Sequence, residues 1–291
     1  MKGGGYAADP RHRRQPPPSV QRVLRDIQAG HAIIGKYPTL KDHECVLSEI
    51  DPDGWAAGGA WDNANLNFRN TEYYPSFVAR TFDKASRYAR QHRWDLKCLT
   101  WAFLFVGERC FEGTRVFSTQ GIDKPILNLF RMYAKLGRQE LLFESTGTQD
   151  PLTYDDLWGR GAPPEISGFA TLTGNQSVEV LIYNHHDDWN EQGEYAVDVV
   201  VENLPFEAQE LVLRHYRIDR SHSSAYPEWV RQGKPMYPAP GQQAAIRARA
   251  GLELVEPPRR LTLTAGKVQV TFTLPVHGIS LLVVTPSPAG T

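Results

Sequence analysis

The stretch ECVLSEI, residues 44–50, is a short apolar run that carries a carboxylate, Glu49, near its end. Polar residues precede it at positions 41–43, and the turn-forming sequence DPDG follows it at positions 51–54. A run that is apolar on both faces is typical of a parallel strand buried from both sides. The sequence therefore predicts that Glu49 lies at the C-terminal end of a buried strand, where a turn begins.

Helical and strand patterns alternate around this run. Apolar residues recur at helical spacing over residues 19–29, 74–93 and 125–137, and the last of these segments opens with proline and stops at glycine. The run LTWAFLFV, residues 99–106, predicts a second buried strand. This alternation of helices and strands is the order expected of an α/β barrel or a doubly wound sheet.

After Gly137 the pattern becomes rich in β-strand residues. Seven segments separated by Gly, Pro and Asn turns predict strands over residues 139–146, 177–184, 195–204, 210–218, 260–264, 267–274 and 279–286. Such a series is typical of an antiparallel β-sandwich. We therefore expect a disordered leader over residues 1–18, which are rich in Gly, Arg and Pro, an α/β part over 19–138, and a β-sandwich domain over 139–291.

The composition limits the class of partner. Lys and Arg total 32 and Asp and Glu total 33, which gives a net charge of -1 at pH 7. Phosphate binding needs a basic surplus, so this balance argues against nucleic acid as the main partner. It gives no support for an anionic membrane surface, and no stretch approaches the roughly 20 apolar residues of a membrane helix.

The cysteines and the first residues bear on the compartment. Cys45, Cys98 and Cys110 have neither zinc-site nor Cys-x-x-Cys spacing, which favours buried reduced thiols. The first residues contain no apolar signal-peptide segment. We therefore expect a cytoplasmic protein if Met1 is the true start.

Glu49 is the sharpest candidate for chemistry. In α/β barrels the catalytic groups lie at the C-terminal ends of the strands, where the βα loops build the site. A carboxylate there could attack an anomeric carbon, or it could be a strand-end Glu that simply meets solvent. Trp101, on the second predicted strand, could form a platform for the apolar face of a sugar ring, unless it belongs to the core.

The loops that follow the two predicted strands supply further candidates. Glu108 and Glu112 are candidate acceptors for sugar hydroxyl groups, or else solvated loop charges. The long loop over residues 51–70 contains Trp55 and Trp61 among Gly and Asn residues. Long loops in compact domains are often functional, and two tryptophans favour a loop that covers substrate over a packed structural loop.

Two polar segments in the β-rich part invite a functional interpretation. NHHDDWN, residues 184–190, resembles a metal cluster, but neighbouring side chains in a strand point to opposite faces, which favours a structural turn over a metal site. RIDRSHSSAYPEW, residues 217–229, has no regular period and predicts a long loop held by side-chain hydrogen bonds. The sequence contains no Gly-rich phosphate loop, Gly-x-Ser-x-Gly elbow or His-Glu-x-x-His motif.

Several of these segments together resemble a known family. They are LSEID (47–51), LTWAFLF with FEG (99–105 and 111–113), GIDKPILNLFRMYAKLG (121–137), and YNHHDD (183–188) with HYRIDRSHSSAYPEW (215–229). From about residue 20 to its end, the chain resembles the C-terminal half or more of glycoside hydrolase family 39, the β-xylosidase-like enzymes. The last segment is the most specific, because its Arg-Ile-Asp, His-Ser and Ala-Tyr elements occur together with the right spacing.

The resemblance implies a (β/α)₈ barrel followed by a β-sandwich, and a double-displacement mechanism with retention that uses two Glu residues. It implies that Glu49 is the nucleophile, at the end of the seventh barrel strand. Trp101 matches the eighth-strand Trp of the sugar site, and Glu112 falls where the family places a sugar-binding acid. No metal or organic cofactor is implied.

The chain also departs from the family pattern. The family's acid/base Glu lies in an Asn-Glu-Pro motif at the end of the fourth strand, and these 291 residues contain no Asn-Glu-Pro. Residues 19–138 would hold only the last two strands and helices of the barrel, a partial catalytic barrel from a truncated chain. Residues 103–105, Phe-Leu-Phe, stand where relatives often carry an acid.

Three hypotheses about function follow. The first is a retaining β-glycosidase that acts on xylosides or related plant-wall sugars and is represented by an incomplete chain. The second is a non-catalytic remnant that serves as a structural or carbohydrate-binding module. In the third, another polypeptide supplies the missing N-terminal half of the barrel in an oligomer.

Overall fold

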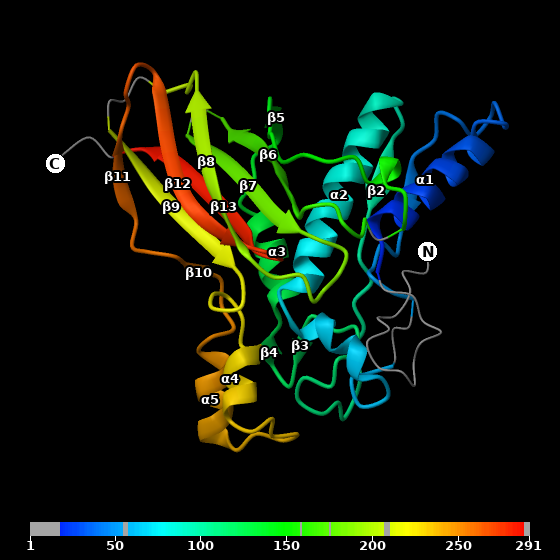
Figure 1. Ribbon diagram of the computed structural model, residues 1–291, viewed down its shortest axis with the longest axis vertical. Helices are drawn as coiled ribbons and strands as arrows, with labels where there is room; N and C mark the ends of the chain where they lie inside the picture. Colours follow the sequence, from blue (N-terminus) through cyan, green and yellow to red (C-terminus); the bar gives the residue numbers. More distant parts are fainter. Residues whose placement is uncertain (1–17, 55–57, 158, 175, 207–209, 288–291) are drawn as a thin grey trace.

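The computed structural model describes residues 18–54, 58–157, 159–174, 176–206 and 210–287. The N-terminal third of the chain lies beside a two-layered β structure built from the C-terminal half (Figure 1). The leader expected over residues 1–18 falls outside the described residues, except for Pro18. Within the described ranges, no helix is both long and apolar enough to cross a membrane.

Two long helices pack against each other in the first part of the chain. They are α1, Val20–Ile34, and α2, Tyr73–Gln91, and their apolar faces share a core with Ile50 and Trp94. The expected bounds of α2 are correct to within two residues. α1 continues five residues beyond its expected end, through Gly30, because one Gly within a helix costs only about 1 kcal/mol.

A short parallel pair of strands lies beside these helices. β1, Cys45–Leu47, pairs with β2, Leu96–Cys98, and no closed barrel forms among the described residues. The strand expected over 99–106 is therefore wrong in position. The expected burial of the first strand on both faces is also wrong, because Val46 of β1 is 48% exposed. The pair has no third strand beside it within the described ranges, so residues 99–106 have no ladder to join.

The β structure consists of two antiparallel layers. The larger sheet has the order β10-β9-β13-β7-β6-β5 with β11 paired to β9, and the smaller sheet contains β12 and β8. The strands are β5 (Gln139–Leu141), β6 (Glu165–Thr173), β7 (Ser177–His185), β8 (Glu194–Glu202), β9 (Glu210–Ile218), β10 (Glu253–Leu254), β11 (Arg259–Thr262), β12 (Lys267–Pro275) and β13 (Ile279–Pro286). An apolar core fills the space between the layers.

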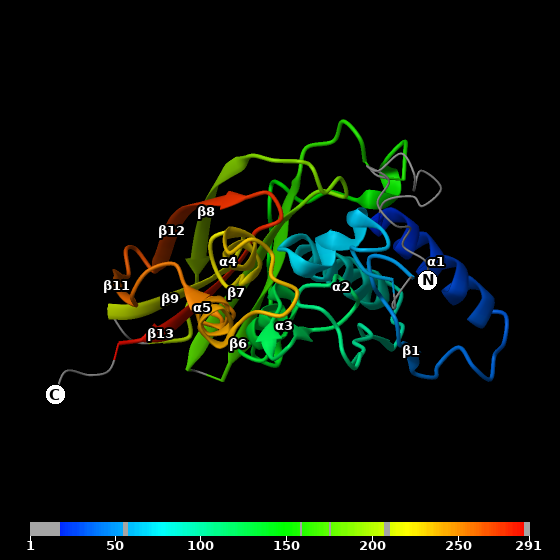
Figure 2. The ribbon, with the colours of Figure 1, turned by 90° about the horizontal axis from the view of Figure 1, so that it is seen from below.

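The larger sheet is buried on its other face as well. There α2 and α3, Pro125–Tyr133, cover it, as Figure 2 shows from below. Side chains alternate along β7, so that Val180 belongs to the core between the layers and Leu181 to the core beneath the helices. The helices and both layers therefore form one continuous structure, and the domain boundary at residues 138 and 139 stays a prediction.

Small elements close the lower end of the molecule in Figure 1. They are η2 (Ala64–Asn70), the hairpin of β3 (Ser118–Thr119) and β4 (Ile122–Asp123), α4 (Tyr226–Arg231) and α5 (Pro240–Arg247). Another short helix, η3 (Pro151–Thr153), contacts α1. Residues 217–229 are a loop only in their middle, because they begin in β9 and end in α4. Trp229 of α4 packs on Phe111 in a small core that includes the buried free cysteine Cys110, while Cys45 and Cys98 are free and half-buried.

Candidate active site

Glu49 lies two residues beyond β1, at the C-terminal end of the strand pair. The backbone continues the pairing to this point, since the Ile50 N–H donates to the Leu99 carbonyl at 2.8 Å. The Glu49 side chain is 35% exposed, although Ile50 beside it is buried in the core. The local structure therefore presents a partly solvent-facing carboxylate at a strand end, where the sequence pattern placed it.

Arg115 holds this carboxylate and was not anticipated from the sequence. Its Nη2 donates to Glu49 Oε2 at 3.0 Å, and its Nη1 donates to the Asp53 carbonyl at 2.7 Å. The same Nη1 lies 3.2 Å from Asp51 Oδ2, and the Arg115 side chain is only 1% exposed. One buried guanidinium thus fixes the turn after β1 and orients Glu49.

Asp51 is the second carboxylate on this guanidinium. It accepts hydrogen bonds from the Tyr74 hydroxyl at 2.8 Å and from the Trp101 N–H at 3.3 Å. Burial raises the pKa of Asp51 to about 6, although Arg115 acts in the opposite direction. At 1% exposure Asp51 is enclosed, so its contacts support the site and do not face a substrate.

Trp101 lies at the same edge as Glu49, because its backbone N–H donates a hydrogen bond to Asp51. Its ring is 46% exposed and stacks on Phe103 with the ring centroids 4.7 Å apart. Phe103 in turn stacks on Phe105 and lies under the Arg115 guanidinium, whose central carbon is 5.4 Å from the ring centroid. The structure therefore joins an exposed aromatic surface to the residue that holds Glu49.

Glu112 belongs to a neighbouring group. The Arg109 N–H donates to Glu112 Oε2 at 2.8 Å, and the Arg109 side chain, which pairs with Glu112, lies over the exposed ring of Trp61 at 4.8 Å. The hydrogen bond from Arg109 lowers the pKa of Glu112. Arg69 connects the residues around Glu112 to those around Glu49, because it donates to the Gly113 carbonyl and pairs with Asp53.

Glu108 has a more interior position. It accepts a hydrogen bond from the Thr114 hydroxyl, and burial raises its pKa. The ammonium group of Lys124, fully buried, donates to the Thr114 carbonyl at 3.1 Å, and burial lowers the pKa of Lys124 to about 8. These contacts indicate that Glu108 and Lys124 support the loop that contains Thr114. Trp55, the remaining candidate, lies outside the described residues.

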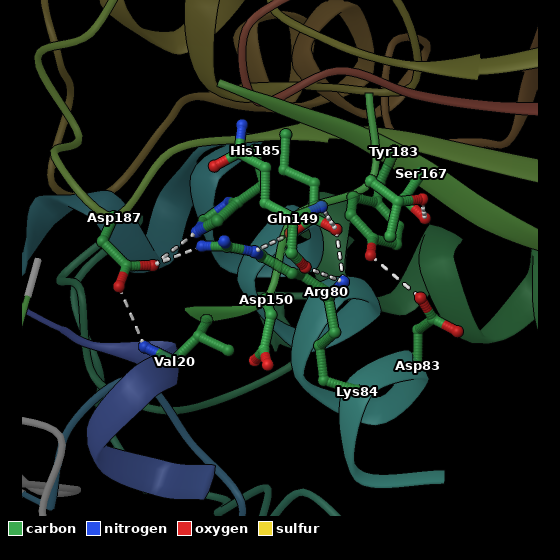
Figure 3. A network of polar contacts seen from close by, with 12 residues as sticks. Val20, Arg80, Asp83, Lys84, Gln149, Asp150, Ser167, Tyr183, His185 and Asp187 are labelled. Atoms are coloured by element: carbon green, nitrogen blue, oxygen red, sulfur yellow. Dashed lines mark hydrogen bonds and ion pairs between the residues drawn. The ribbon is translucent and has the colours of Figure 1, made fainter. Parts of the chain in front are cut away.

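Residues 184–190 form an anchor between elements, as Figure 3 shows. Asp187 accepts a hydrogen bond from the Val20 N–H at the start of α1 and lies 3.2 Å from Arg80 of α2. Arg80 also donates to Glu165 at 2.7 Å, and His185 Nδ1 is 2.9 Å from the Ser76 hydroxyl. Within the described ranges, no three His, Cys, Asp or Glu side chains are arranged to hold a metal ion.

Several solved structures superpose on this chain. A bacterial orthologue of human α-L-iduronidase superposes with a TM-score of 0.75 at 18% identity, over 94% of this chain and 47% of that one. The family 39 enzyme of Xanthomonas axonopodis pv. citri gives 0.67 at 14% identity, over 91% of this chain and 49% of that one. A monomeric β-xylosidase from Caulobacter crescentus CB15 gives 0.69 at 14% identity, over 93% and 51%.

These solved structures are similar in fold, and this chain spans about half the length of each. The search of curated proteins found no match. The family model for glycosyl hydrolases family 39 matches residues 45–264, which is more than half of the chain and includes Glu49, Trp101 and Arg115. The family suggested by the sequence motifs is thereby confirmed, and the chain belongs to glycosyl hydrolases family 39.

Proposed function

We propose that this chain supplies the nucleophile of a retaining β-glycosidase that acts on xylosides or related β-glycosides, and that Glu49 is that nucleophile. The observation that carries the proposal is the pairing of Glu49 with a buried guanidinium at a strand end, where the carboxylate remains 35% exposed. Arg115 engages Oε2 at 3.0 Å. Glu49 Oε1 is then the oxygen that would attack the anomeric carbon.

In the proposed reaction, a bond forms between Glu49 and the anomeric carbon while the glycosidic C–O bond breaks. The leaving oxygen takes a proton from a general acid, and water later releases the sugar with net retention. Asp51 has a raised pKa, but its 1% exposure and its contacts with Tyr74 and Arg115 make it unsuitable as that acid. We propose that the acid comes from residues outside these 291.

The other candidates would bind substrate around Glu49. We propose that the 46% exposed ring of Trp101 is the platform for a sugar ring, because its backbone shares Asp51 with the Glu49–Arg115 pair. Glu112 and Trp61, joined through Arg109, would form the rim. Glu108 is partly buried and hydrogen-bonded to Thr114, so it is a weaker candidate for substrate binding than Trp101 or Glu112.

The leaving group of an aryl β-xyloside provides the test. Without a general acid, the purified chain should still release 2,4-dinitrophenolate, because this leaving group departs unprotonated. The rate of release of p-nitrophenol from the corresponding xyloside should be lower by about 10²-fold or more. Glu49→Gln should abolish release of both. Glu44→Gln, an exposed carboxylate in the same stretch, is the matched control and should match the wild type.

The remnant hypothesis predicts the opposite result. A chain that releases no dinitrophenol above the Glu49→Gln background would contradict the proposal and favour a non-catalytic module. If a polypeptide with an Asn-Glu-Pro motif co-purifies and restores p-nitrophenyl xyloside turnover, the acid comes from a partner.

A further inference from the structure

The two β layers are unequal in size, and a groove lies where the smaller layer ends. The larger sheet has seven strands, whereas the smaller one contains only β8 and β12. The groove has a volume of about 590 Å³ and is lined by β8, by residues 141–147 and by core side chains of β6 and β7. We call it the β8 groove. Neither Glu49, Trp101 nor Glu112 lines it, so it is separate from the candidate active site.

The floor of the β8 groove is apolar. Side chains that pack against the core between the layers reach the groove and are only partly buried there, namely Leu141, Phe143, Ile166, Val199 and Val201. In a sandwich, the inward-facing side chains of one sheet are normally covered by those of the other. A third strand beside β8 would therefore bury these side chains under its own inward-facing residues.

One edge of β8 has no strand beside it. Among the residues that the structure describes, β8 pairs with β12 alone. Because β8 lines the groove and β12 does not, the other edge of β8 borders the groove. In an antiparallel pair, every second residue directs its N–H and C=O away from its partner, and such a row of groups is a template for another strand. This edge selects an extended polypeptide, whose backbone offers donors and acceptors at the same spacing.

The charges at the β8 groove are negative. Among the described residues its lining contains Glu144, Asp198 and Glu202 but no Lys, Arg or His. Side chains alternate along β8, so that Glu194, Asp198 and Glu202 share its exposed outer face, at every fourth position. Glu202 pairs with Lys267 of β12. An added strand would have these carboxylates as cross-strand neighbours, which favours Lys or Arg at its outward positions.

The same charges disfavour a second copy of this chain. Symmetric antiparallel pairing of β8 along its whole length would place Asp198 opposite Asp198 and Glu194 opposite Glu202. Like charges directly opposite each other destabilise a strand pair. We propose that the β8 groove binds an extended segment of a partner polypeptide, in which inward apolar residues alternate with outward basic and polar ones. The segment adds to β8 as a third strand of the smaller sheet.

Three nine-residue peptides match the length of β8 and separate the contributions to binding. The probe KVTVKVTVK has valines for the floor and lysines at every fourth position, and its sequence is the same in either strand direction. EVTVEVTVE reverses the charge. KVPVKVPVK keeps the charge and the valines, but its prolines cannot donate backbone hydrogen bonds. The measurements are the fluorescence anisotropy of labelled peptides and amide hydrogen exchange of the intact chain.

We expect KVTVKVTVK to bind at least about tenfold more tightly than either control peptide, and to slow exchange at alternate amides of β8. The double variant Asp198→Lys with Glu144→Lys changes two exposed carboxylates of the groove and should prefer EVTVEVTVE. The matched control, Glu44→Lys with Glu256→Lys, changes two exposed carboxylates outside the groove and should keep the wild-type preference. Urea unfolding of both double variants checks that they fold.

The inference is overturned if KVTVKVTVK does not bind, binds no more tightly than KVPVKVPVK, or leaves exchange in β8 unchanged. The same charge preference in wild type and in the folded groove variant would also overturn it. A dimer of the wild-type chain that protects the β8 amides without peptide would assign the groove to a second copy instead. These measurements involve no glycoside, so their outcome is independent of the role of Glu49.

Discussion

At the scale of single residues, Arg115 is the group on which the candidate active site depends. It contacts Glu49, Asp51 and the Asp53 carbonyl from a position that is 1% exposed. Sequence reasoning found Glu49 because a strand-end carboxylate has a recognisable pattern. It could not find Arg115, because that residue lies 66 positions further along the chain in a segment without a motif.

Replacement of Arg115 should separate positioning from folding. A lysine has one ammonium group and cannot contact Glu49 and Asp51 as a planar fork does, so Arg115→Lys should slow attack by Glu49 by about 10²-fold. The measurement is the kcat for 2,4-dinitrophenyl β-xyloside, with unfolding followed in urea. Arg69→Lys, equally buried and paired with Asp53, is the control; an equal loss of kcat in both variants at equal stability would contradict the assignment.

Asp51 should make stability depend on pH. Its pKa is raised by burial from 3.8 to about 6, so between these values the folded state keeps a proton that the unfolded state has released. The contribution of Asp51 to the free energy of unfolding therefore falls by about 3 kcal/mol as the pH rises from about 4 to about 6, and it stays constant at higher pH.

Urea unfolding of wild type and Asp51→Asn at several pH values measures this effect. Asn does not titrate, so its stability relative to wild type should improve across the same window. Asp187, whose pKa burial also raises to about 6, is present in both proteins and cancels in the comparison. Parallel stability curves for the two proteins would show that Asp51 has no such shift.

At the scale of elements, several antiparallel strands were predictable, but β6, Glu165–Thr173, was not expected and β5 ends five residues earlier than expected. β7, β9 and β12 each begin and end within about two residues of the expected bounds, because alternating apolar residues fill a core between two layers. The segment 99–106 was equally apolar, yet it is not a strand, and Leu104 is 88% exposed. A strand needs a neighbour, which its own sequence does not reveal.

The anchor formed by Arg80 should dominate the stability of the junction between α2, α1 and β7. Arg80→Met leaves Asp187 buried without its cation and Glu165 paired with Lys84 alone, which should lower the free energy of unfolding by about 3–5 kcal/mol. Arg90→Met removes an ion pair with Glu140 from the exposed side of the same helix and should cost less than about 1 kcal/mol. Similar losses in the two variants, measured in urea, would refute the anchor.

At the scale of the whole molecule, the family was predictable and the extent of the barrel was not tested. Motifs near Glu49, Trp101 and Tyr226 indicated family 39, and the family model over residues 45–264 agrees. The described residues form only one parallel pair, β1 with β2, and the chain spans about half the length of the solved relatives. Completion of the site from outside these residues therefore remains a proposal.

Covalent trapping tests the role of Glu49 most directly, because it needs no general acid. 2,4-Dinitrophenyl 2-deoxy-2-fluoro-β-xyloside loses its phenolate unprotonated, and the fluorine slows release of the bound sugar, so an attacking carboxylate stays labelled. Peptide mass spectrometry should find the fluoroxylosyl group on Glu49 in wild type and in Glu44→Gln, and no label in Glu49→Gln. An unlabelled wild-type chain, or a label on any other residue, would contradict the assignment of Glu49 as the nucleophile.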